Sequence, residues 1–194
     1  MDNELILKVE NVYKKYRLGT IGGGTLTGDL QSWWAKIRHK EELVDGEYAI
    51  GVQVAIINSK KQILISQRAP DKKILPLKWE CNGGAVLSGE DFVGALIREI
   101  QEELGIKLER EEIIFHKSVK RERSFKEMYV VRKDIKIEDL RFADGEAVAG
   151  AGVDIDEFER MFNLGEIVHN VNFDRNDYEK CVEILEEREV VKGE

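Results

Sequence analysis

The sequence predicts an α+β fold in which a mixed β-sheet is layered between helices. Three observations lead to this prediction: strand-like segments outnumber helical ones, hairpin connections recur, and helical segments interrupt the strands in an irregular order. A chain of 194 residues is long enough for one domain of ordinary size with some residues left over. We therefore expect one layered domain over residues 46–190, preceded by an extension over residues 1–45.

The strands of the domain are predicted from runs rich in β-branched and aromatic residues. Residues 47–58 and 62–69 are expected to pair as a hairpin across a short turn. The remaining predicted strands are 80–87, 111–123, 125–135 and 146–155, of which 111–123 and 125–135 form a second hairpin. Helices are expected over 92–104, 156–163 and 176–189. Asp91 or Ser88 is the expected cap at the start of the first helix, and Gly105 ends it.

The extension has a different pattern. Residues 5–13 alternate like a strand, 17–28 form a glycine-rich loop, and 29–42 predict a short amphipathic helix. The pair Trp33–Trp34 in that helix suits packing within the chain or a homodimer contact.

Charge and cysteine content restrict the partners and the compartment. The net charge of −8 argues against a long nucleic-acid strand, because such binding depends on neutralising many phosphates. The sequence contains no run of about 18 apolar residues and no signal-peptide pattern, so we expect no membrane span and no secretion. Cys81 and Cys181 form neither a disulfide framework nor a metal-binding spacing, which predicts two reduced thiols in a cytoplasmic protein.

The helix predicted over 92–104 gathers three glutamates. Its apolar residues fall on one stripe that is expected to face the core, namely Val93, Leu96, Ile97, Ile100 and Leu104. Glu99, Glu102 and Glu103 share an adjoining stripe, where like charges destabilise a helix by roughly 0.2–0.5 kcal/mol per pair. A bound divalent cation would reverse the sign of that effect. The alternative is an ordinary solvated acidic face.

The spacing around these glutamates favours a binding role. Gly84, Glu90, Arg98-Glu99, Glu102-Glu103 and Gly105 stand at intervals that resemble the Nudix box at every defined position, with aliphatic residues at 100 and 106. The flanking stretches GVQVAIINSKKQILISQR and KWECNGG are also similar to Nudix hydrolases. The resemblance covers about residues 46–190 and implies the α/β/α Nudix sandwich.

The resemblance also implies a reaction: hydrolysis of a diphosphate linkage in a nucleoside diphosphate derivative or related small molecule, with Mg²⁺ or Mn²⁺. By matching position, the implied metal ligands are Glu99, Glu102, Glu103 and a backbone carbonyl near Gly84. Glu103 or Glu146 is then the candidate that orients or deprotonates water. Arg98 and Glu90 are expected to hold the helix and loop in place, and Gly84 and Gly105 to make tight turns.

The substrate-binding residues are predicted less specifically. Arg68 lies where the approach to the pocket is expected, together with Lys72 and Lys73, and each can bind a phosphate. Solvation is the alternative for the lysines. Trp79 is a candidate for base stacking, with packing as its alternative.

Two other functions compete with hydrolysis. Isopentenyl-diphosphate isomerase shares the fold, but its Cys-Gly-His pattern has no match here, because no histidine occurs between residues 40 and 115. A non-catalytic ligand-binding protein of the Nudix fold would usually have lost box glutamates, and here they are intact. Residues 1–40 resemble the start of an ATP-binding subunit of a polysaccharide-exporting ABC transporter, without its phosphate-binding loop.

Overall fold

The computed structural model describes residues 49–87, 89–122, 124–168 and 173–192. Its strands are β1 (Ala49–Ile57), β2 (Ile63–Arg68), β3 (Trp79–Ala85), β4 (Ile114–Arg121), β5 (Ser124–Arg132) and β6 (Ala147–Val153). Its helices are α2 (Phe92–Leu104), α3 (Ile155–Asn163) and α4 (Arg175–Lys192), with short 3₁₀ turns η1 (Arg110–Glu112) and η2 (Ile137–Asp139). The expectations for residues 1–45, including the extension and the tryptophan pair, lie outside the described residues.

The strands form one mixed sheet, as predicted, in the order β4-β5-β1-β3-β2-β6. β1 and β5 run parallel, and the other neighbouring strands run antiparallel. The predicted pairing of β1 with β2 is wrong beyond its turn, because the two strands pair only at Ile57 and Ile63. From there they diverge, and β3 fills the gap by pairing with β1 through its last residues and with β2 through its first.

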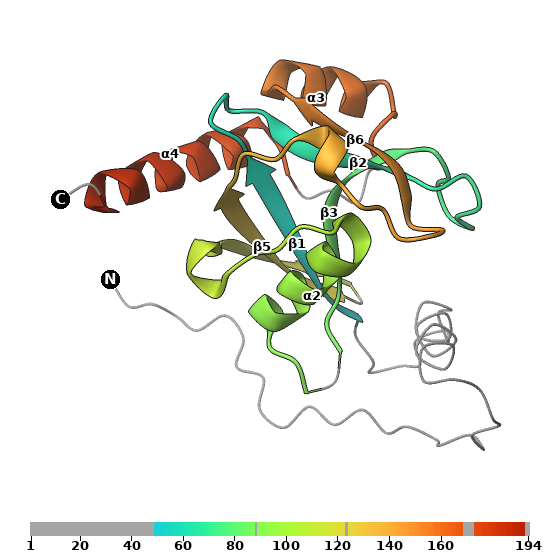
Figure 1. Ribbon diagram of the computed structural model, residues 1–194, viewed down its shortest axis with the longest axis horizontal. Helices are drawn as coiled ribbons and strands as arrows, with labels where there is room; N and C mark the ends of the chain where they lie inside the picture. The colour runs from blue at the N-terminus through green and yellow to red at the C-terminus, as the bar shows by residue number, and fades with distance from the viewer. Residues whose placement is uncertain (1–48, 88, 123, 169–172, 193–194) are drawn as a thin grey trace. The chain divides into compact units, whose positions relative to one another are not determined.

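Side chains alternate between the two buried faces of the central strands, so the sheet lies between two helical layers. On β1, Val52, Val54 and Ile56 pack in the core that contains α2, while Ala55 and Ile57 pack in the core that contains α3 and α4. Figure 1 shows α2 on one side of the sheet and the later helices on the other. The predicted α/β/α layering is confirmed.

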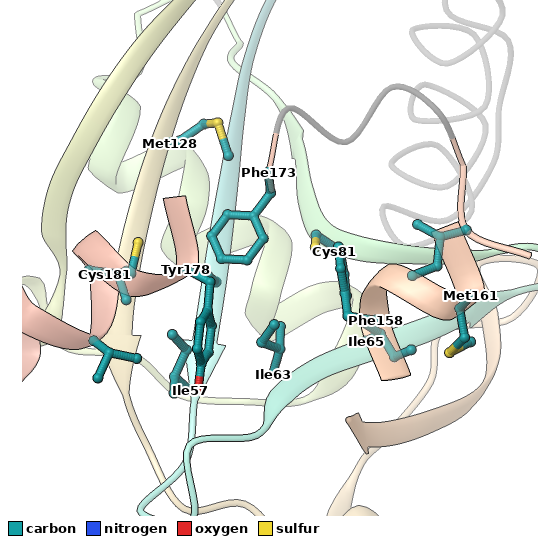
Figure 2. Close-up of a cluster of buried hydrophobic side chains, with 14 of the residues drawn as sticks. Ile57, Ile63, Ile65, Cys81, Met128, Phe158, Met161, Phe173, Tyr178 and Cys181 are labelled. Carbon is teal, nitrogen blue, oxygen red and sulfur yellow. The ribbon is translucent and has the colours of Figure 1, made fainter. Parts of the chain in front are cut away.

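The core beneath α3 and α4 joins residues from distant parts of the chain. Figure 2 shows Phe173, Tyr178 and Cys181 lying over the strand residues of the cluster. The Tyr178 hydroxyl donates to the Lys61 carbonyl at 2.8 Å, which ties α4 to the turn after β1. Cys81 and Cys181 are both free and buried, as predicted for reduced thiols, and burial raises the pKa of each to about 12.

Candidate active site

Helix α2 has the limits that its end residues predict. The Asp91 carboxylate accepts a hydrogen bond from the Gly94 backbone N–H at 2.6 Å, so Asp91 is the N-cap. Gly105 ends the helix in the left-handed region at φ 70°, and its N–H donates to the Gln101 carbonyl. Both local signals fix the helix at 92–104, and the glutamates therefore occupy its last two turns.

The face that α2 buries differs in part from the predicted stripe. Leu96, Ile100 and Leu104 are buried as expected, but Ala95 is buried where Val93 and Ile97 are only half-buried. The three glutamates are also unequal: Glu99 is only 3% exposed, Glu103 is half-buried and Glu102 is exposed. The predicted shared stripe therefore runs from the protein interior out to the solvent.

Arg98 connects the carboxylates of the box. Its Nε and Nη2 donate to the two oxygens of Glu90 at 2.7 and 2.9 Å, a bidentate pair. Its Nη1 donates to Glu99 at 3.0 Å and lies 3.5 Å from Glu102, and Nη2 also reaches the Ala85 carbonyl at 3.0 Å. Glu90 in turn accepts from the Leu87 N–H at 3.0 Å, so the arginine holds strand, loop and helix together.

The ion pair also sets the protonation state of Glu90. The hydrogen bond from Arg98 lowers the pKa of Glu90 below its ordinary range, and it outweighs the opposing effect of burial. Glu90 therefore stays ionised over a wider pH range than a free glutamate does.

Gly84 makes room for Glu99. The tight-turn role expected for Gly84 is wrong, because it lies within strand β3, paired with Val52 of β1. A Cβ at this position would lie 2.1 Å from the Glu99 Cδ, closer than any van der Waals contact permits. The glycine thus provides the space in which the buried carboxylate lies.

Gly84→Ala is accordingly expected to destabilise the protein by about 2 kcal/mol, because the added methyl must displace Glu99 from a packed site. Urea unfolding measures this loss. Gly152→Ala in β6 is the matched control, since its nearest neighbour would lie at an ordinary 3.5 Å. Equal stability of the two variants would contradict the close packing of Glu99 on Gly84.

Glu146 lies on the segment before β6, which is hydrogen-bonded to the end of α2 through residues 141 and 143. The Arg141 N–H donates to the Leu104 carbonyl at 2.9 Å, and the Ala143 N–H donates to the Glu103 carbonyl at 3.3 Å. These bonds fix residues 141–143 against the end of α2, and the Glu146 N–H donates to the Ala143 carbonyl at 3.1 Å. The Glu146 carboxylate pairs with the Lys72 ammonium, and both side chains are mostly buried. The sequence indicates Lys72 only as a cation on the approach to the pocket, because its partner lies 74 residues away and local spacing does not connect the two.

The two predicted substrate-binding residues have structural contacts in this arrangement. Arg68 donates through Nη1 to both oxygens of Glu80 at 3.0 and 2.8 Å and through Nε and Nη2 to loop carbonyls. Trp79 is half-buried against the core beneath α3 and α4, and bridges to Ile167. The packing alternative therefore describes the observed contacts of Trp79, while contact of either residue with substrate stays a prediction.

The carboxylates do not form a ready-made cage. Over the part of the chain that the structure describes, no three His, Cys, Asp or Glu side chains are placed to hold a metal ion together. The Arg98 guanidinium lies among Glu90, Glu99 and Glu102 and supplies positive charge there.

No helix in the described ranges is both long and apolar enough to cross a membrane.

A mixed sheet between helical layers, with an arginine-braced acidic helix packed on a strand glycine, defines the class of this domain. The family model described as the NUDIX domain matches residues 47–181. The chain belongs to this family of hydrolases.

Known relatives agree with this assignment. The chain is 33% identical to the uncharacterized Nudix hydrolase lmo0368 of Listeria monocytogenes over 129 residues, which are 66% of this chain and 76% of that protein. It is 31% identical to the uncharacterized Nudix hydrolase lin0387 of Listeria innocua with the same coverage. The structure of DR0079 from Deinococcus radiodurans matches with a TM-score of 0.60 at 23% identity, over 74% of this chain and 88% of that one. At that identity the likeness establishes the fold alone.

Proposed function

We propose that this protein is a Mg²⁺- or Mn²⁺-dependent pyrophosphohydrolase that cleaves a diphosphate linkage in a nucleoside diphosphate derivative or related small molecule. The observation that supports it most is the packing of Glu99 against Gly84 under the Arg98 guanidinium. Burying a carboxylate to 3% exposure costs free energy, because the group loses its contact with water, and a helix on the protein surface does not require a buried carboxylate. Its retention at this position suits an electrostatic function better than a solvated face.

The chemistry of the donor set fits a hard dication. Mg²⁺ prefers carboxylate and carbonyl oxygens and keeps several waters, so one or two carboxylates are enough to hold it. In this proposal the ligands are Glu99, Glu102, Glu103 and the carbonyl of Gly84. When bound, the cation would neutralise phosphate charge and make a bound water easier to deprotonate. The chain's own part is to hold the acidic groups at one end of α2, with Arg98 fixing their orientation.

Two residues are proposed to handle the proton of the attacking water. Glu103 is half-buried at the end of α2, and Glu146 lies on the segment that is hydrogen-bonded to the Glu103 carbonyl. Lys72 pairs with Glu146 and holds its carboxylate in place. A positioned carboxylate is able to accept the proton that water loses as its oxygen bonds to phosphorus.

The partner is proposed to be a small molecule rather than a nucleic-acid strand, since the net charge of −8 repels a long polyanion. A cytoplasmic location and a homodimer belong to the same proposal, the first because both cysteines are free. Sedimentation of the full chain tests the dimer.

Cleavage of a panel of diphosphate compounds into their monophosphate products tests the activity, with Mg²⁺, with Mn²⁺ and with a chelator. We expect turnover with either metal and none with the chelator. Binding without cleavage would favour the non-catalytic ligand-binding protein. Rearranged double bonds in a prenyl diphosphate, without phosphate release, would favour the isomerase.

A further inference from the structure

The loop between β2 and β3, residues 69–78, exposes three aliphatic side chains. Ile74, Leu75 and Leu77 are 54%, 46% and 53% exposed. Leu75 and Leu77 also have positive φ angles of 50° and 59°, a conformation that is uncommon for leucine. Neither burial nor backbone preference accounts for leucines at these positions. Residues held in such conformations are enriched at ligand-binding sites.

The loop is held in this shape by side chains of β2. Arg68 donates to the carbonyls of Ile74 and Leu75 at 2.8 and 3.0 Å, and Gln67 donates to the Leu77 carbonyl at 3.0 Å. Because these bonds fix the backbone, the aliphatic side chains keep their exposed positions. A pre-organised apolar surface binds a ligand without the cost of ordering a loop.

The same loop is attached to the catalytic end of the domain. Lys72 pairs with Glu146, and the Ala69 N–H donates to the Glu146 carbonyl at 3.0 Å. The segment that contains Glu146 is bonded in turn to the Glu103 carbonyl through Ala143. In Figure 1 the loop after β2 and the segment leading into β6 lie side by side. One short segment therefore separates the exposed aliphatic residues from the end of α2.

The composition of the loop indicates the kind of ligand. Within residues 69–78, Lys72 and Lys73 precede the three aliphatic residues and Lys78 follows them, so cationic side chains flank an apolar run, and Lys72 is the one paired with Glu146. Such a surface matches a ligand with an anionic head and a hydrocarbon tail. A nucleobase would favour an aromatic platform. Among the large hydrophobic side chains that the described ranges expose, the one aromatic is Phe115, on β4 at the far edge of the sheet.

We propose that this loop binds the hydrocarbon part of an alkyl or prenyl diphosphate, which makes such compounds the preferred substrates. The inference rests on the proposed function. In the reaction a water oxygen bonds to one phosphorus, that phosphorus loses its bond to the bridging oxygen, and the water proton passes to a carboxylate. The products are an alkyl monophosphate and inorganic phosphate. The net charge of −8 favours a small molecule over an anionic lipid surface as the occupant.

The test compares three probes, geranyl diphosphate, methyl diphosphate and ADP-ribose, with the full chain and Mg²⁺. Leu75→Ser and Leu77→Ser are each expected to lower kcat/KM for geranyl diphosphate about tenfold, through lost apolar burial. The value for methyl diphosphate, which lacks the tail, should stay the same. Leu164→Ser is the matched control, because Leu164 is an exposed leucine at the end of α3. These exposed positions are expected to tolerate serine without loss of fold.

The outcomes separate the inference from the function on which it rests. Equal losses for both diphosphates, or no loss, would overturn the role of the loop. Turnover of ADP-ribose without geranyl diphosphate would also overturn it and leave the proposed hydrolase standing. No turnover of any probe would overturn the hydrolase itself. If the variants lose binding to phosphatidylserine vesicles or lose a dimer while geranyl kcat/KM is unchanged, the loop serves another partner and the proposal is wrong.

Discussion

Glu103→Gln is expected to lower Mg²⁺-dependent turnover by about 10²–10⁴-fold, the range associated with loss of a general base. Glutamine has nearly the shape of glutamate but carries no charge, so it neither accepts a proton from water nor neutralises a cation. The side chain is half-buried at the end of α2. Replacing its carboxylate by an amide of similar size removes the charge without leaving a cavity. The measurement is kcat at saturating substrate and Mg²⁺.

The control for this variant is Glu179→Gln on α4, an exposed helical glutamate away from the box. Its turnover should match that of the unaltered protein. Thermal unfolding of the Glu103→Gln protein should be close to that of the parent, which separates lost chemistry from lost fold. Glu102→Gln is expected to act in the same direction. Retained hydrolysis in both variants would overturn the assignment of these glutamates.

The parts of the site that the sequence predicts are those specified by local chemistry. Asp91 and Gly105 fix the two ends of α2, because an N-cap carboxylate and a left-handed glycine act within one turn of the helix. The resemblance implies that Glu90 and Arg98 hold the loop and the helix in place, and in the structure the two side chains form a bidentate pair at 2.7 and 2.9 Å. Layering follows from the two buried faces of β1, whose near-continuous apolar run is visible in the sequence.

The parts that it does not predict depend on pairing between distant segments. A turn after β1 favours a hairpin, yet β3 lies between β1 and β2 in the sheet. The order of the strands depends on the combined stability of all strand pairings and not on one turn. The space that Gly84 leaves for Glu99 and the partner of Glu146 also join different elements. Helical spacing places Glu99 beside Glu103 and does not show that one is buried and the other half-exposed.

Arg98→Ala is expected to reduce the free energy of unfolding by about 3 kcal/mol, because removing one partner of a buried ion pair leaves the other without compensation. Glu99, whose side chain is 4% exposed, would lose its hydrogen bond from the guanidinium. Glu90 would lose the two hydrogen bonds that it accepts from Arg98. Arg98→Lys keeps a charge without the planar fork, so its loss should be intermediate. Urea unfolding of the three proteins gives these values.

Two further measurements distinguish this role from a surface effect. Arg160 makes a two-bond pair with Glu157 on the solvent-facing side of α3, and Arg160→Ala should leave stability nearly unchanged. The second is pH. Because Arg98 lowers the pKa of Glu90, that stabilisation is complete above the ordinary pKa of 4.5 and is lost as the pH falls through the lowered value. The difference between parent and Arg98→Ala should therefore shrink below pH 4.5. A difference that stays constant through that range, or an equal loss in Arg160→Ala, would contradict the central position of Arg98, since only a carboxylate held by the guanidinium titrates in this way.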